Sequence, residues 1–98
     1  MTPTAILLRA DGTQEPVMPA NGKHFKLAEL QKLVQGYVEV VSMPGVLILV
    51  VNDDGKGVLP VNQQASNVWY HAYEGQDVDF AGDYIAGDAV LMHTSMMK

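Results

Sequence analysis

The 98-residue sequence contains no cysteine. That absence excludes disulfides, cysteine-ligated zinc, iron–sulfur clusters and thiol nucleophiles, and it favours a reducing compartment. Long apolar runs are also missing, because the longest one covers only residues 46–51, whereas a helix needs ~20 apolar residues to cross a bilayer. The N-terminus shows no basic segment followed by an apolar stretch, so we expect neither a membrane span nor a secretory signal.

Positive charge is scarce as well. Six basic residues stand against eleven acidic ones, which gives a net charge of −5, and residues 71–98 contain five acidic residues but one basic residue, Lys98. Binding to a phosphate backbone requires clustered Lys and Arg, so we expect no direct nucleic-acid ligand. The acidity either keeps a small protein soluble or forms a face that meets a basic partner.

The composition that remains is that of an ordinary globular chain, with 48% hydrophobic and 17% charged residues. A chain of this length supports one core, so we expect a single domain over residues 1–98. Residues 5–9 and 13–17 are typical of two strands joined by a tight turn at Asp11 and Gly12. Pro16 lacks a backbone N–H and therefore predicts that the second strand lies at a sheet edge.

An amphipathic pattern predicts a helix over residues 27–35, with Leu27, Leu30 and Val34 on its apolar face. Gly36 is expected to end this helix in a left-handed conformation. At the other end Lys26 occupies the N-cap position. Its side chain cannot accept a backbone N–H, although Glu29 supplies half of a capping box.

Residues 37–41 and 46–51 flank a Pro-Gly turn and predict an antiparallel hairpin. Its second strand is apolar on both faces, so we expect it to lie centrally, covered on both sides or packed under a helix. Residues 56–61 are compatible with a further short strand.

Asn62 is a good N-cap for a second helix over residues 63–73. The apolar face of this helix is expected to consist of Ala65, Val68, Trp69 and Ala72. An acidic loop at 77–82, strands at 83–85 and 89–94, and a frayed end at 95–98 should follow. The resulting order, ββαββ(β)αββ, predicts an α+β domain with a curved, mostly antiparallel sheet and two packed helices.

No set of residues indicates catalysis or a cofactor. The serines lie outside any nucleophile elbow, and the histidines show no metal-ligand spacing. Asp77, Asp79 and Gly82 match positions of a calcium loop, but Ala81 stands where an oxygen ligand is needed. We therefore expect a non-enzymatic protein without metal or cofactor, and an acidic loop in place of a calcium site.

The candidate partner-binding residues lie around the end of the second predicted helix. They are two tyrosines and three acidic residues, Tyr70, Tyr73, Glu74, Asp77 and Asp79. The tyrosines either form an exposed aromatic pair of the kind enriched at binding hot spots, or lie against the sheet edge with hydrated hydroxyls.

Nearly the whole chain resembles an uncharacterised family, a domain of unknown function, of short proteins carried by bacteriophages and mobile elements. The likeness rests on residues 6–17, 25–36, 37–41, 50–55, 59–62 and 83–89, which include Leu-x-Glu-Leu-Gln-Lys-Leu-Val and Asp-Tyr-Ile-Ala-Gly-Asp-Ala. The chain departs from the family at Lys26, where a small hydroxyl is usual, and in the tyrosine-rich stretch 69–73.

The resemblance implies an accessory protein that acts in the bacterial cytoplasm and modulates a host or phage protein, with inhibition of a defence system as one form of that function. The alternative is an oligomer that binds and sequesters a nucleotide-like signal at a subunit interface. An anionic signal would need basic side chains, and only five precede the acidic third: Arg9, Lys23, Lys26, Lys32 and Lys56.

Overall fold

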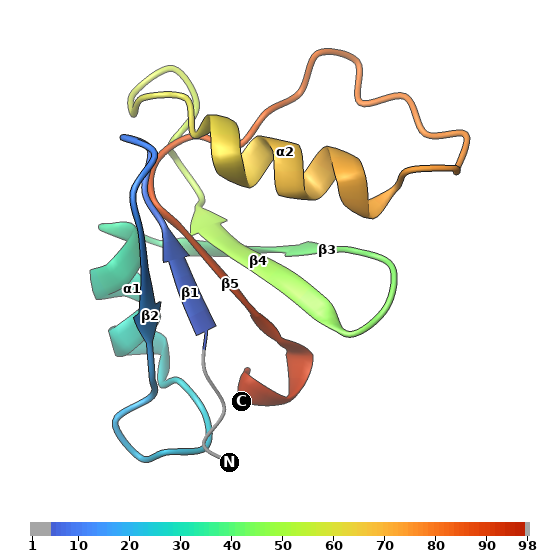
Figure 1. The fold of residues 1–98 in the computed structure, drawn as a ribbon. Helices are drawn as coiled ribbons and strands as arrows, with labels where there is room; N and C mark the ends of the chain where they lie inside the picture. The colour runs from blue at the N-terminus through green and yellow to red at the C-terminus, as the bar shows by residue number, and fades with distance from the viewer. Residues whose placement is uncertain (1–4, 98) are drawn as a thin grey trace.

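The computed structural model describes residues 5–97, which form one five-stranded antiparallel sheet and two helices (Figure 1). The sheet order is β2-β1-β5-β4-β3. The elements are β1 (Ala5–Leu8), β2 (Gln14–Val17), α1 (Leu27–Val34), β3 (Val38–Ser42), β4 (Leu47–Asn52), α2 (Gln63–Ala72) and β5 (Ala89–His93), followed by a 3-10 turn at Thr94–Met96. The predicted α+β class is confirmed, and β2 with its proline is an edge strand.

Strand β4 is an inner strand that is buried on both faces, as predicted. Ile48 and Val50 belong to one core with Leu30 and Val34 of α1. Leu49 and Val51 face the opposite side, where a second core contains Ala65 of α2. The sheet thus lies between the two helices, because successive residues of a strand point to opposite faces.

Helix α1 begins at Leu27 as predicted, but the exposure of this residue and the C-terminus of the helix differ from the prediction. Leu27 was expected on the apolar face but is 57% exposed, and the buried residues of this short helix are Leu30 and Val34. At the C-terminus Gln35, with φ of +63°, takes the left-handed conformation predicted for Gly36. Gly36 is needed for space instead: a Cβ there would lie 2.6 Å from the side-chain nitrogen of Asn52. That nitrogen donates to the Val34 carbonyl at 2.9 Å.

The short strands predicted at 56–61 and 83–85 are wrong. The structure has only an isolated bridge between Val61 and Ala86. The backbone of Ile85 is occupied by α2, because its N–H donates to the Ser66 hydroxyl and its carbonyl accepts from the Asn62 N–H at 2.8 Å. At residues 83–85 the backbone partner is thus the N-terminus of a helix and not a strand, and at 56–61 Val58 and Leu59 donate their N–H groups to the Gly55 carbonyl in a turn.

Helix α2 begins as predicted and ends one residue earlier, at Ala72. The Asn62 side chain accepts from the Ala65 N–H at 2.9 Å and forms the N-cap. Ala65 is fully buried, while Val68, Trp69 and Ala72 are half-buried against the second core. Among the residues described, no helix has the length and apolarity to cross a membrane.

The predicted fraying of residues 95–98 is wrong for residues 95–97. Met96 is 1% exposed within the first core, and its carbonyl accepts from the Phe25 N–H at 2.9 Å. A parallel bridge joins Phe25 to Met97. Burial of a long methionine side chain thus fixes a segment without regular strand pattern. Lys98 lies outside the described residues.

Candidate functional site

An aromatic cluster holds the segment after α2 against the helix. The Phe80 ring lies edge-on to three aromatic rings of the end of α2, with centroids 4.7 Å from Trp69, 4.9 Å from Tyr70 and 5.8 Å from Tyr73. Such edge-to-face pairs contribute about 0.5–1.5 kcal/mol beyond their buried area. Phe80 was not singled out in the sequence, and its only signal is that it is the one large ring in an otherwise acidic loop.

Both tyrosine hydroxyls are occupied by backbone carbonyls. Tyr70 donates to the Asp83 carbonyl, and Tyr73 donates to the Ser42 carbonyl, at the end of β3, at 3.0 Å. Both residues are half-buried. Tyr73 therefore lies against the sheet edge, as in the second of the two alternatives, whereas Tyr70 lies against the 83–86 segment, and both hydroxyls bind protein groups. What the tyrosines can still offer a partner is the remaining exposed part of their rings.

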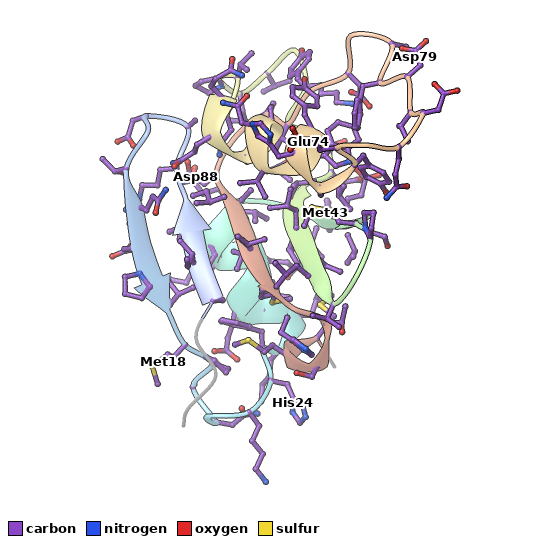
Figure 2. All side chains as sticks on the ribbon, turned by 45° about the vertical axis from the view of Figure 1, so that its right-hand side comes forward. Met18, His24, Met43, Glu74, Asp79 and Asp88 are labelled. Atoms are coloured by element: carbon purple, nitrogen blue, oxygen red, sulfur yellow. The ribbon has the colours of Figure 1, made fainter. Side chains whose placement is uncertain are left out.

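The three candidate carboxylates Glu74, Asp77 and Asp79 are all exposed. Within the part of the chain that the structure describes, none is paired with Lys or Arg. Glu74 lies 3.6 Å from the Nδ1 atom of exposed His71, and Asp79 accepts the N–H of Ala81 at 2.8 Å. Figure 2 shows Asp79 at the outer end of the loop, pointing away from the sheet. The acidic loop is therefore a solvated, negatively charged surface on an aromatic anchor.

The other two acidic residues of this region have structural partners. Asp83 pairs with Lys56 and accepts the Tyr84 N–H at 2.9 Å. The hydrogen bond from the Lys56 ammonium holds the pKa of Asp83 below its ordinary value. Asp88 accepts the Ala10 N–H at 3.0 Å and so ties the β1–β2 turn to the start of β5. These two carboxylates already bind groups of the protein, so they are less available to a partner than Glu74, Asp77 and Asp79 are.

A cleft of about 440 Å³ lies on the α2 side of the sheet, beside β3. Its walls come from β3 and β4, the 53–56 turn, α2 and the 83–86 segment. Three carboxylates (Glu39, Asp53 and Asp83) and one base (Lys56) line it, with Trp69 and Tyr84 as the aromatic part of the wall. Because Lys56 is already paired with Asp83, the uncompensated charge of the cleft is negative.

The histidines and carboxylates of the described residues were also compared with the requirements of a metal site. Within residues 5–97, no three His, Asp or Glu side chains are close enough together to hold a metal ion. The Nδ1 atom of His93 lies 2.8 Å from the Ser95 hydroxyl, a contact that no sequence motif indicates. The same Nδ1 atom accepts the Ser95 N–H at 3.0 Å, so this exposed histidine caps the 3-10 turn.

Comparison with known proteins identifies a family but no activity. The family model described as "Domain of unknown function (DUF3846)" matches residues 1–95. No curated protein matches the chain. No solved structure matches it either.

Proposed function

The chain belongs to this family of unknown function, and we propose that it is a non-enzymatic binding protein of a bacteriophage or mobile element. It binds a host or phage protein in the bacterial cytoplasm and modulates the activity of that protein, for example by inhibiting a defence system. The phage context, the location and the role in modulation rest on the sequence resemblance. Binding through surface contact rests on the acidic loop.

One observation carries the proposal. Three exposed carboxylates lie in the segment after α2: Glu74 in the turn that follows the helix, and Asp77 and Asp79 in the acidic loop, which Phe80 fixes to α2. An anchored loop loses less conformational entropy on binding than a free one, so its charges are pre-positioned for a basic surface. The half-buried rings of Tyr70 and Tyr73 lie beside the loop and would add contact area.

The alternative function, sequestration of an anionic signal, has weaker support. The described cleft beside β3 contains one ammonium group, that of Lys56, and Asp83 already neutralises it. Glu39 and Asp53 would repel a phosphate there. Native mass spectrometry of the protein expressed in its host separates the two functions, because it detects either a bound protein or a bound small molecule.

The test removes the charge of the loop without changing its shape. A triple variant, Glu74→Gln with Asp77→Asn and Asp79→Asn, is compared with wild type for association with the partner recovered from host lysate. Because rim charges act mainly on the on-rate, we expect association at low salt to slow about tenfold and its salt dependence to flatten.

A control variant removes the same number of charges elsewhere, through Asp11→Asn, Glu15→Gln and Asp54→Asn. It should associate nearly as fast as wild type, which would show that position and not net charge matters. Equal association rates and equal recovery of the partner by wild type and the loop variant would overturn the proposed role of the acidic loop.

A further inference from the structure

The two edges of the sheet differ in what their backbone offers. At the β2 edge, Arg9 donates its N–H to the Thr13 carbonyl across the turn, and the register pairs Leu7 with Glu15. Since hydrogen-bonded pairs alternate along an antiparallel ladder, Pro16 occupies an outward-facing position. Its ring removes the N–H that would point to solvent, which closes this edge to further strands.

The β3 edge has no such protection. Asp53 donates its N–H to the Tyr37 carbonyl at 2.8 Å, so the alternate residues Glu39 and Val41 turn their backbone groups toward β4. The backbone groups of Val38, Val40 and Ser42 therefore point outward. β3 pairs only with β4. Among the described residues, Tyr73 is the one side chain that bonds this outward row, at the Ser42 carbonyl.

The side chains along β3 present a different chemistry on each face of the sheet. Glu39 and Val41 lie on the α2 side, where Glu39 joins Asp53 in lining the cleft. Val38 and Val40 lie on the α1 side, and Val40 is 41% exposed. A strand added to this edge would therefore meet negative charge on one face and apolar surface on the other.

We propose that the β3 edge binds an extended segment of the protein partner in which basic and apolar residues alternate. This inference rests on the proposed function, in that the ligand is a protein. The added strand would use the outward N–H and C=O groups of Val38 and Val40. Its Arg or Lys side chains would enter the cleft at Glu39 and Asp53, and its apolar side chains would pack beside Val40.

Charge decides between this occupant and a second copy of the chain. A copy would bring another net charge of −5 to the edge and a second Glu39 to the same strand pair, where like charges repel. A basic segment instead neutralises the two carboxylates of the cleft that have no basic partner. The edge and the cleft beside it therefore fit a cationic strand better than a self-association.

The probe is a blocked seven-residue peptide of alternating valine and arginine, titrated into ¹⁵N-labelled protein. We expect the largest amide shifts along β3 and slower hydrogen exchange of the Val40 N–H. Val40→Pro should weaken binding at least tenfold, since it removes an outward N–H that no ladder bond uses. Val40→Ile keeps both that N–H and an apolar side chain, so its loss of affinity should stay well below tenfold.

A charge variant keeps the test decisive if Val40→Pro fails to fold. Glu39→Lys leaves the backbone unchanged and should also weaken binding at least tenfold, and a peptide with glutamate in place of arginine should not bind wild type. Absence of binding, unchanged affinity of the folded variants, or shifts centred elsewhere would overturn the inference. A wild-type dimer that Val40→Pro dissociates would assign the edge to a second copy and would also overturn it.

The outcomes separate this inference from the proposed function. If Val40→Pro still binds the natural partner as wild type does while the acidic-loop variant loses it, the edge is not the docking site and the proposed function stands. If the peptide binds at β3 but the protein expressed in its host carries no bound protein, the edge still binds an added strand, whereas the proposed function as a protein-binding protein is refuted.

Discussion

The two helices begin in opposite ways. Helix α2 begins at Asn62, which is 0% exposed. Its amide nitrogen donates to the carbonyls of Leu8 and Gly87, both at 2.8 Å, while its oxygen caps the helix. Helix α1 begins at exposed Lys26, whose side chain makes no cap hydrogen bond. There Glu29 accepts the Lys26 N–H and the Ala20 N–H, both at 2.9 Å.

The start of α1 is a local cap, whereas the start of α2 is a junction between segments that are distant in the sequence. The hydrogen bonds at Lys26 connect residues no more than nine positions apart. Asn62 instead joins β1, the 85–87 segment and α2, which are far apart in the sequence. A buried polar group costs about 1–3 kcal/mol when it loses its partner, whereas an exposed one is satisfied by water. The two N-termini should therefore respond very differently to substitution.

The largest effect is expected for Asn62→Ala. This change leaves two buried carbonyls and the Ala65 N–H without their partner, and we expect the free energy of unfolding to fall by roughly 3 kcal/mol. Asn62→Asp keeps the capping acceptor but loses both donors, so it should be at least as destabilising. Urea denaturation at pH 7 measures both variants.

Asn67→Ala is the matched control, because Asn67 is an exposed residue of the same helix. It should change stability by less than about 0.5 kcal/mol. If Asn62→Asp were as stable as wild type, capping alone would explain Asn62 and its role as a junction would be refuted.

A smaller effect of opposite sign is expected at the start of α1. Lys26 has the extended backbone of an N-cap, with φ of −80° and ψ of 154°. Lys26→Thr supplies the missing acceptor and should stabilise the protein by about 0.5–1 kcal/mol in urea denaturation. Lys23→Thr removes the same charge outside the helix. An equal gain from Lys23→Thr would attribute the effect to charge and not to capping.

The smallest effect is expected for the charge of Glu29. The hydrogen bonds from the Lys26 N–H and then the Ala20 N–H lower the pKa of this carboxyl in the folded protein. A lowered folded pKa gives stability that is present above the unfolded pKa and is lost as pH falls through the folded pKa. Glu29→Gln keeps a capping acceptor without charge, so wild type should be slightly more stable at pH 7, and the difference should disappear as the pH falls through the lowered pKa of Glu29 in the folded protein. A difference that is independent of pH would contradict this linkage.

Several features could be predicted because they depend on neighbouring residues. Pro16 predicts an edge strand whichever strand is its neighbour, because it lacks a backbone N–H. The apolar residues on both faces of β4 predict that other elements pack against each face of the sheet. Asn62 was identified as an N-cap from its residue type and place. The acidic loop was also identified from the sequence, because the number of acidic residues in a segment can be counted without a structure.

The sequence by itself therefore determined the fold class, the N-cap residues of both helices and the acidic surface, because propensity, periodicity and charge act over a few residues. Only the tertiary structure decided that Phe80 anchors the acidic loop, that the Ile85 backbone pairs with α2 and that Gln35 turns left-handed beside Asn52. It also left the β3 edge unpaired beside a negative cleft. Each of these depends on contacts between residues distant in the chain, where burial and hydrogen bonding outweigh local preference.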